Sequence, residues 1–370
     1  MNAPLVSVAM VTRNVERFLP EAIESILKQT WKDLDLMIVD FGSTDRSKLI
    51  ISEYQSKDPR VKFHEVPSCT LSEARNASCF LSTGRYIAIM DADDVAVPDR
   101  LARQVEFLER HPAVGVLGGA TEWIDENGKA LCNHFYPTGA SEIRDALLSG
   151  SPFCNPTVVI RRDIFAAAGG FRKPFVSAED YDLWLRVAER CEMANLPNVV
   201  LRYRIHPHQE SQRNVMQMTM GALAARAAAD ARNSGKPDPL DSVEEITPAT
   251  ISGLGVEERT RHTALARHYL TWIRLMLGAG QHAVALELAG RALTTEDLRQ
   301  AEKWAVADIR LAASQTYWRQ GRFFRSATYA CHAVLTRPVL LARPFKPLLA
   351  RSRARLQPSP GGEPAIGPGR

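Results

Sequence analysis

Three carboxylates follow a short apolar run near the middle of the first half of the chain. Residues 86–90 are almost entirely apolar, and Asp91, Asp93 and Asp94 come directly after them. Such a run is typical of a buried parallel strand, and open α/β sheets bind ligands at the carboxyl ends of their strands. Crowded carboxylates repel one another, and Mg²⁺ or Mn²⁺ would relieve that repulsion. A solvated acidic turn that caps the next helix explains the spacing equally well, so both interpretations stay open.

Two further groups downstream could do chemistry. Glu179 and Asp180 stand before an amphipathic helix predicted over 181–190, and His206 follows a strand predicted over 199–204. A carboxylate within hydrogen-bond reach of a hydroxyl can act as a general base, although Asp at this place is also a good helix cap. A single histidine is more often a hydrogen-bonded side chain than a ligand. From the residues alone, capping is the simpler interpretation of Asp180.

The elements that must position these groups alternate between strand and helix. Apolar runs of four to seven residues predict strands, and apolar residues at helical spacing predict helices between them. This alternation predicts an α/β domain with a doubly wound, mostly parallel sheet that binds a nucleotide-type ligand at its strand ends. The expected strands cover 5–11, 36–39, 61–64, 86–90 and 114–119, and the expected helices cover 21–29, 46–56, 71–81 and 99–110.

Composition narrows the class of protein. The chain has 370 residues, of which 45% are hydrophobic and 24% charged, with a net charge of +4, so we expect two domains and no nucleic-acid partner. Its six scattered cysteines form no Cys-x-x-Cys pair, which favours reduced thiols in a cytoplasmic protein. No signal peptide is expected, and no stretch approaches the ~18 apolar residues of a spanning helix.

The carboxyl-terminal part has a different character. Residues 211–256 are predicted to form a helical segment and linker, and 257–356 an all-α region. Stretches beginning at Gly280 and Gly321 resemble tetratricopeptide units, although they are farther apart than the ~34 residues of a regular repeat. Two units are too few for an independent solenoid, so we expect an appendage that packs on the first domain or joins protomers of a homo-oligomer.

The end of the chain is basic and then rich in Pro and Gly. Residues 336–356 hold six basic residues and no acidic one. Such a segment could rest on anionic lipid at the inner face of the plasma membrane, or it could be a solvated terminal helix. Residues 357–370 are predicted to be a disordered tail.

Taken in order, several motifs of residues 1–210 resemble the family 2 glycosyltransferases, which have the GT-A fold. No single motif is specific, but their order along the chain is that of the family. The matching stretches are Thr12-Arg13-Asn14, 25–30, 39–45, Ala74-Arg75-Asn76, 91–94, 155–162 with 169–172, 179–184, and 203–207.

The resemblance implies roles for the acidic residues. Asp93 would ligate a divalent cation, Mn²⁺ or Mg²⁺, and Asp91 would contact the ribose or a metal-bound water. His206 would be a further ligand of the metal or contact the diphosphate. Asp180 would be the general base, and direct displacement with one base would invert the anomeric centre. Asp94 is expected to begin the turn into the next helix.

The resemblance also implies a nucleotide-sugar site formed by Thr12, Asn14, Asp40 and Arg75. Arg75 could donate to the diphosphate or base, but a surface arginine on a helix explains it equally well. The family usually has a second acidic residue after Asp40, and this chain has Phe41 instead. An aromatic ring can stack on a base but cannot accept a hydrogen bond from uracil. A UDP-sugar is favoured as the donor, and Phe41 is the departure that puts it in doubt.

The predicted function is therefore metal-dependent, inverting transfer of a sugar from a nucleotide-diphospho-sugar to a glycan or lipid-linked acceptor, in cell-surface polysaccharide synthesis. One alternative is a catalytically inert sugar-nucleotide-binding scaffold that works through its helical repeats. Another is a nucleotidyltransferase, against which the lack of a glycine-rich, basic phosphate loop counts. Aromatic residues within 120–155 could form an acceptor surface or a buried satellite cluster.

Overall fold

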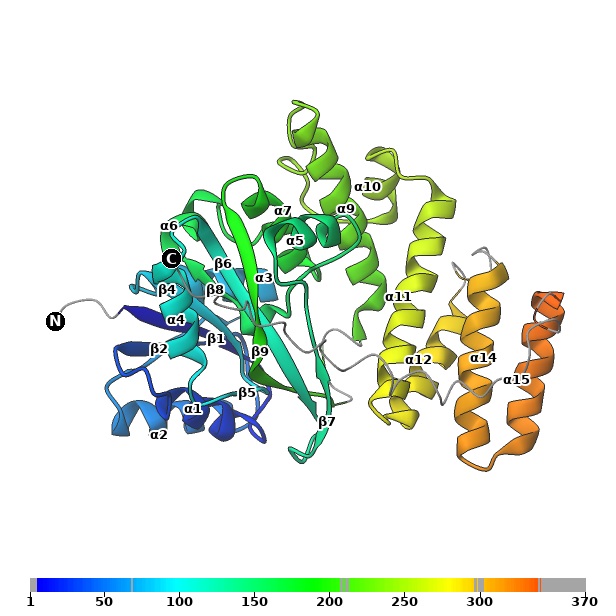
Figure 1. The fold of residues 1–370 in the computed structure, drawn as a ribbon, viewed down its shortest axis with the longest axis horizontal. Helices are drawn as coiled ribbons and strands as arrows, with labels where there is room; N and C mark the ends of the chain where they lie inside the picture. Colours follow the sequence, from blue (N-terminus) through cyan, green and yellow to red (C-terminus); the bar gives the residue numbers. More distant parts are fainter. Residues whose placement is uncertain are drawn as a thin grey trace, which may run out of the picture.

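A mixed β-sheet with helices on both faces forms one part of the molecule, and a group of helices follows it (Figure 1). The computed structural model describes residues 5–340 except 68, 207, 208, 210–212, 296, 297, 299–302 and 339. Within these residues the strands are β1 (Val6–Thr12), β2 (Leu34–Asp40), β3 (Val61–Glu65), β4 (Tyr86–Asp91), β5 (Val95–Ala96), β6 (Val114–Ile124), β7 (Ala130–His134), β8 (Val159–Arg161) and β9 (Glu192–Arg204).

The strand order is β3-β2-β1-β4-β8-β6-β9-β5, with β7 paired to β6. The first four strands in this order are parallel, and β6 is parallel to β9. Short β8 is antiparallel to both β4 and β6, while β5 and β7 are also antiparallel to their neighbours. The sheet is thus mostly parallel, as predicted, but not purely so. The antiparallel pairing of β7 follows from the short hairpin that joins it to β6, because such a hairpin reverses the direction of the chain.

The described helices fill the connections between strands and continue beyond the sheet. They are α1 (Leu19–Leu27), α2 (Ser47–Lys57), α3 (Leu71–Leu81), α4 (Arg100–Arg110), α5 (Ala140–Leu147), the 3-10 helix η1 (Asn155–Thr157), α6 (Arg162–Ala167), α7 (Glu179–Ala188), α9 (Val215–Asn233), α10 (Pro248–Gly253), α11 (Glu258–Gly278), α12 (His282–Thr294), α14 (Lys303–Arg319) and α15 (Phe323–Thr336).

Most expected elements occur within two or three residues of their predicted ends, and α3 has the predicted ends. One difference concerns function, because α7 begins at Glu179 and not at 181. Both Glu179 and Asp180 therefore lie in its first turn. Carboxylates are stabilised there by the amino-terminal end of the helix dipole.

The sheet separates two hydrophobic cores. One face packs against α1, α2 and α4, with residues such as Val8 of β1 and Ile23 of α1 fully buried. The other face packs against α5, α6, α7 and α9, with Ile89 of β4 and Trp184 of α7 in that core. Alternate residues of β4 point to opposite faces, as the pleat of a strand requires, so both faces need apolar side chains. This explains why the strand reads as a continuous apolar run.

The carboxyl-terminal helices have a core of their own. It is formed by α11, α12 and α14 and reaches the sheet domain through Trp123, Ile205 and Val215. Gly280 and Gly321 both have positive φ, 76° and 72°, at the turns that separate α11 from α12 and α14 from α15. Glycine suits these turns because side chains rarely tolerate that backbone conformation. Helix pairs are present as expected, while their likeness to tetratricopeptide units stays a prediction.

Two expectations about the membrane concern different parts of the chain. No helix within the described residues is long and apolar enough to cross a membrane. The predicted basic segment lies almost wholly beyond residue 340, and the predicted disordered tail lies entirely beyond it, so both fall outside the described residues.

Candidate active site

The register of the parallel strands brings three predicted site residues to one edge of the sheet. Thr12 at the end of β1 is paired with Asp40 at the end of β2, and Val11 is paired with Asp91 at the end of β4. Thr12 and Asp40 are buried. Among the described residues, Thr12 Oγ1 and Asp40 Oδ2 have no hydrogen-bond partner. Buried polar atoms are nearly always paired, so these two oxygens are open to a hydrogen-bond partner from a ligand or water.

The other oxygen of Asp40 organises the loop that follows β2. Asp40 Oδ1 accepts hydrogen bonds from the backbone N–H groups of Gly42 (3.1 Å) and Ser43 (3.0 Å). Asn14 links this loop to the one after β1, because its side-chain oxygen accepts from the N–H of Thr44 (2.8 Å). Asn14 also has a left-handed φ of 54°. Its carboxamide oxygen is thus engaged with protein, which indicates a role in shaping the loops.

Asp93 and His206 meet at the end of β4. Asp93 Oδ2 lies 2.9 Å from His206 Nε2, although the two residues are far apart in sequence. His206 is only 6% exposed, and its ring lies 5.0 Å from that of Phe18. The structure therefore brings together the two residues expected to ligate a metal.

Asp94 faces away from this pair and holds β9 in place. It is 1% exposed, and its Oδ1 accepts a hydrogen bond from the backbone N–H of Arg204 (2.8 Å). Burial and the charges of Asp93 and Asp91 raise the pKa of Asp94 well above its usual value. The buried guanidinium of Arg204 in turn donates to the backbone oxygen of Asp93 (2.8 Å) and to Glu21 (2.6 Å). Arg204 therefore fixes the acidic turn, a role that the sequence did not reveal.

Arg75 joins the acidic turn to the start of α7. Its Nη2 lies 3.2 Å from Asp91 Oδ1, and its Nη1 donates to Glu179 Oε1. The side chains of Arg75 and Glu179 are 13% and 4% exposed. Arg75 is therefore not a surface arginine, and its guanidinium is committed to two carboxylates. Glu179 was not assigned a role from sequence, although its place before Asp180 could have drawn attention to it.

Asp180 lies in the first turn of α7, half-buried beside this ion pair. Burial raises the pKa of Asp180, and the positive charge of Arg75 opposes that rise. The negative charge of Asp180 also acts on Asp91. The pKa of Asp91 is raised overall, because burial and the charges of Asp93 and Asp180 outweigh the opposing effect of Arg75. The preceding residue, Ala178, has a left-handed φ of 66°, an unusual conformation for a residue with a side chain. Strained backbone of this kind is concentrated at functional sites.

A further buried polar group lies at the start of η1. Asn155 is 7% exposed, and neither atom of its carboxamide has a hydrogen-bond partner among the described residues. Burial and then the charge of Asp94 raise the pKa of the neighbouring Cys154 thiol well above the usual value, with smaller contributions from Asp91 and Asp180. Sequence reasoning did not single out Asn155, and the only signal was its place in the motif 155–162.

Part of the expected acceptor region is a cluster of three rings, those of Trp123, His134 and Tyr136. The rings of Trp123 and His134 stack 5.5 Å apart, and that of Tyr136 lies 4.9 Å from His134. Trp123 is 5% exposed and belongs to the core of the carboxyl-terminal helices. Packing against that core is sufficient to explain an aromatic residue at position 123, so a contact with a sugar is not needed to account for it.

The chemistry of the residues at the acidic turn fits a divalent cation. No group of three or more His, Cys, Asp or Glu side chains that could hold a metal occurs in the described part of the chain. Asp93 and His206 nevertheless supply one carboxylate and one imidazole at a single point. Mg²⁺ and similar cations commonly bind through one or two carboxylates, with substrate phosphates and water completing the coordination. Two protein ligands are sufficient for such a site.

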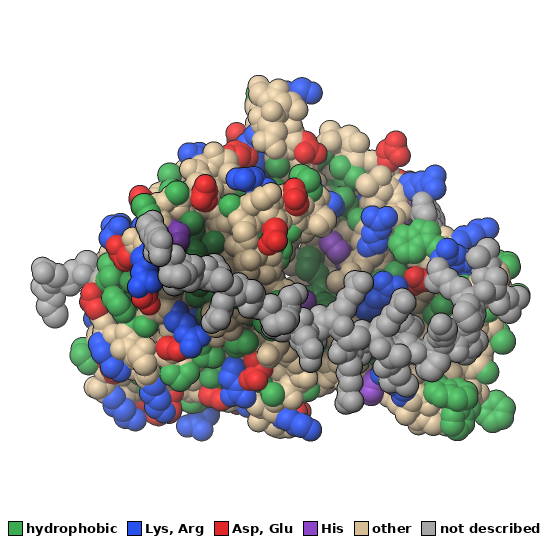
Figure 2. Space-filling view, viewed as in Figure 1, with side chains coloured by type: hydrophobic (Ala, Val, Ile, Leu, Met, Phe, Trp, Pro, Cys, Tyr) green, Lys and Arg blue, Asp and Glu red, His purple; other side chains and the backbone are tan. Residues whose placement is uncertain are grey.

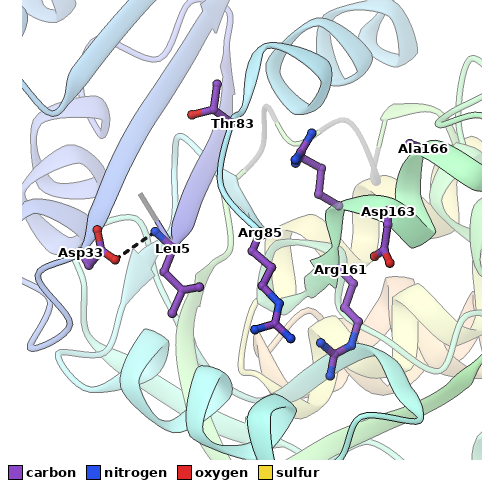
Figure 3. Close-up of a pocket in the computed structure, with 8 residues that line it drawn as sticks. Leu5, Asp33, Thr83, Arg85, Arg161, Asp163 and Ala166 are labelled. Atoms are coloured by element: carbon purple, nitrogen blue, oxygen red, sulfur yellow. Dashed lines mark hydrogen bonds between the residues drawn. The ribbon is translucent and has the colours of Figure 1, made fainter. Parts of the chain in front are cut away.

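A hollow at the opposite end of the sheet does not belong to this site. It lies where β1 and β4 begin, and Figure 3 shows Leu5, Arg85 and Arg161 among the residues that line it. Arg161 is engaged with backbone, because its Nη2 donates to the oxygen of Leu108 (2.7 Å) and its Nε to that of Val114 (2.9 Å). The hollow is thus separated from the carboxylates by the length of the strands.

The fold is that of a GT-A glycosyltransferase. Residues 7–168 match the family model described as "Glycosyl transferase family 2". An uncharacterized glycosyltransferase of Methanocaldococcus jannaschii is 34% identical over 211 residues, which are 55% of this chain and 72% of that protein. The O-antigen biosynthesis glycosyltransferase WbnJ of Escherichia coli is 31% identical over 206 residues, 55% of this chain and 80% of that one. The chain belongs to glycosyltransferase family 2, and it is a glycosyltransferase.

Solved structures share the fold over most of the chain. Residues 1–349 of Staphylococcus aureus TarS in complex with UDP-GlcNAc give a TM-score of 0.51 at 15% identity, covering 92% of this chain and 93% of that one. The mannosyltransferase PcManGT from Pyrobaculum calidifontis, in complex with GDP-Man and Mn²⁺, gives 0.50 at 18% identity, covering 91% and 88%. At these identities the likeness establishes the fold, and the predicted mostly parallel α/β sheet followed by helices is confirmed.

Proposed function

We propose that this protein is a metal-dependent, inverting glycosyltransferase that moves a hexose from a nucleotide-diphospho-sugar to a glycan or lipid-linked acceptor in cell-surface polysaccharide synthesis. The observation that carries this proposal is made at one edge of the sheet. Asp93 meets His206 there, and Arg75 pairs with Asp91 and with Glu179, the residue before Asp180. Relatives named for O-antigen and amylovoran biosynthesis support the choice of polysaccharide synthesis.

Asp93 and His206 are the residues that would hold the cation. A divalent cation, when bound, acts as a Lewis acid that stabilises the charge developing on the departing diphosphate. The buried, unpaired oxygens of Thr12 and Asp40 would receive the ribose or base, and Asp91 would contact the ribose or a water of the cation. Arg75 holds Asp91 in position through their ion pair, and a contact of Arg75 with the diphosphate or base stays a prediction.

Asp180 would accept the proton of the acceptor hydroxyl as that oxygen attacks the anomeric carbon. A general base must be ionised to act, and Arg75 favours the ionised form of Asp180 against burial. With one base and no covalent intermediate, the displacement inverts the anomeric centre. Asn155, which is buried and has two open hydrogen-bonding atoms, would bind a hydroxyl group of the acceptor or the transferred sugar.

The donor base is proposed to be uracil. Phe41 is the departure from the family pattern that bears on this choice, and a donor screen tests it. The ring of Phe41 packs in a small apolar cluster with Val66, Cys69 and Leu71, and the guanidinium of Arg13 lies 5.6 Å from its centre. This stack offers a base a flat surface but no acceptor for the imide N–H. Thermal shift with UDP-, GDP- and dTDP-sugars, each with Mn²⁺ or Mg²⁺, would identify the donor by the largest increase in Tm.

The decisive experiment measures turnover. The purified chain with the stabilising donor, Mn²⁺ and a candidate acceptor should release nucleoside diphosphate as the sugar moves to the acceptor, or to water where no acceptor is present. Chelation of the cation should stop the release. Stabilisation by donor without any turnover, with or without candidate acceptors, would instead indicate an inert sugar-nucleotide-binding scaffold.

The proposed location is the cytoplasmic side of the membrane. The proposed role of the carboxyl-terminal helices includes contacts between protomers.

A further inference from the structure

The turn between α14 and α15 exposes an unbroken run of residues, 318–325. Three of them are large aromatic residues, Trp318, Phe323 and Phe324, with exposed fractions of 63%, 56% and 94%. Three others are arginines. We call residues 318–325 the aromatic tip. Figure 2 shows hydrophobic side chains gathered at the lower right of the molecule, where this turn lies in Figure 1.

The aromatic tip projects from the helices and is not a groove. The rings of Trp318 and Phe323 pack edge to face with their centres 4.9 Å apart, so the two side chains support one another outside the core. Phe324 beside them is almost completely exposed. Single exposed apolar residues are common on proteins, but several together mark a surface that meets another molecule.

The tip is positively charged as well as aromatic. It contains Arg319, Arg322 and Arg325, and no Asp or Glu occurs from residue 309 to 340. Two of these arginines are held against Tyr317, with guanidinium-to-ring distances of 5.5 Å for Arg322 and 5.8 Å for Arg325. The sequence continues with further basic residues and no acidic one up to residue 356. The partner of this surface should therefore be anionic.

The size and shape of the tip favour a lipid surface over a protein partner. Three aromatic side chains bury at most about 150–250 Å² each, which is less in total than the ~800 Å² per partner of a typical stable protein interface. A protruding knob also needs a matching pocket on a protein, whereas the headgroup region of a bilayer accommodates it without one. Aromatic residues next to arginines are characteristic of segments that lie in this region.

We propose that the aromatic tip inserts into the headgroup region of a membrane that contains anionic phospholipid. The tip lies on α14 and α15 and shares no residue with the site around Asp93 and Asp180. Loss of lipid binding would therefore leave glycosyl transfer to a water-soluble acceptor intact, and failure of either proposal can be told apart from failure of the other.

Flotation of the full chain with vesicles tests this proposal. The wild-type chain should float with phosphatidylcholine vesicles that contain phosphatidylglycerol, and much less with phosphatidylcholine alone or in high salt, which screens the arginines. The variant Trp318→Ser/Phe323→Ser/Phe324→Ser and the variant Arg319→Gln/Arg322→Gln/Arg325→Gln should each reduce recovery by about tenfold. Both variants should keep the wild-type Tm, because every substituted side chain is exposed.

Two control variants sharpen the result. Leu49→Ser/Leu148→Ser removes apolar side chains that are 61% and 74% exposed elsewhere on the surface, and it should float as the wild type does. A full-length variant with the basic residues of 341–356 changed to Gln separates the tip from the segment that follows it.

Wild-type recovery of both tip variants would overturn the proposal, and so would a loss of flotation confined to the 341–356 variant. A third contradicting outcome is a concentration-dependent dimer of the wild-type chain, seen by sedimentation and abolished by the tip variants, with no flotation. That result would assign the tip to contact between two copies of the chain.

Discussion

Arg75 forms an ion pair with Asp91, with 3.2 Å between Nη2 and Oδ1, and the other arm of the same guanidinium contacts Glu179. One buried arginine thereby connects the strand end that carries the acidic turn with the helix that carries Asp180. The planar guanidinium suits this position because it can pair with two carboxylates at once. The geometry of the proposed metal site and that of the proposed base are thus coupled through a single side chain.

Replacing Arg75 with methionine should move the acid limb of the pH–rate profile to higher pH. The guanidinium lowers the pKa of Asp180, which burial raises. A general base is active only when ionised, so turnover falls as the pH drops through its pKa. Without Arg75 that pKa is higher, and the loss of turnover begins at a higher pH. The pH dependence of kcat/KM measures this shift.

The same replacement should also destabilise the protein by about 3–5 kcal/mol, because it leaves buried carboxylates uncompensated. Arg85→Met, which removes an arginine with a side chain 58% exposed, is the matched control and should change neither the profile nor the Tm appreciably. An unchanged acid limb in Arg75→Met would show that Arg75 does not act on the base.

Asp93→Asn and Asp94→Asn should behave differently although the two residues are adjacent. Asp93 is placed with His206, so its amide variant should lose the increase in Tm that donor and Mn²⁺ give together. In Asp94→Asn the side-chain oxygen can still accept from the N–H of Arg204, and the raised pKa of Asp94 indicates a site that tolerates a neutral group. Its free energy of unfolding should therefore change by less than about 1 kcal/mol.

Asp94→Ala completes this series, since it leaves the buried N–H of Arg204 without its acceptor. Its cost should be about 1–3 kcal/mol, measured by denaturant unfolding. Equal loss of donor binding in Asp93→Asn and Asp94→Asn would contradict the different orientations of the two carboxylates.

Asp180→Asn should lower turnover by about 10²- to 10⁴-fold while donor binding and Tm are kept, because it removes a proton acceptor and little packing. Asp182, two residues on, is the natural comparison. It is completely buried and pairs with Arg172 and with Arg186 (2.8 Å), so Asp182→Asn should reduce stability. Steady-state kinetics and thermal unfolding separate the two effects. Full turnover of Asp180→Asn would reject it as the base.

Gly221→Ala tests how α9 supports the turn before α7. A Cβ atom at Gly221 would lie 2.4 Å from the backbone oxygen of Ser177, next to Ala178 with its left-handed backbone. The turn must shift, so kcat should fall several-fold with little change in the KM for donor, and stability should fall by about 1–3 kcal/mol. Gly290→Ala in α12 is the control, because a Cβ there meets nothing within 4 Å and should be neutral or stabilising.

The sequence by itself determined the class of fold and predicted the chemistry at the end of β4. Continuous apolar runs followed by polar turns are sufficient to predict a parallel sheet, because burial on both faces leaves no alternative to apolar side chains. The order of the motifs was sufficient to predict a family 2 glycosyltransferase, and the family is confirmed. The roles of Asp93, His206 and Asp180 stay predictions that the experiments above address.

Only the tertiary structure decided which side chains contact one another. The sequence is compatible with Arg75 as a surface residue or as a ligand contact. Its pairing with Asp91 and Glu179 depends on how α3 and α7 pack on the same face of the sheet. Asp93 and Asp94 are adjacent and chemically identical in the sequence. Only the position of β9 decides that Asp93 contacts His206 and that Asp94 accepts a hydrogen bond from Arg204. Such long-range pairings follow from three-dimensional packing, since local propensity and periodicity describe neighbours along the chain.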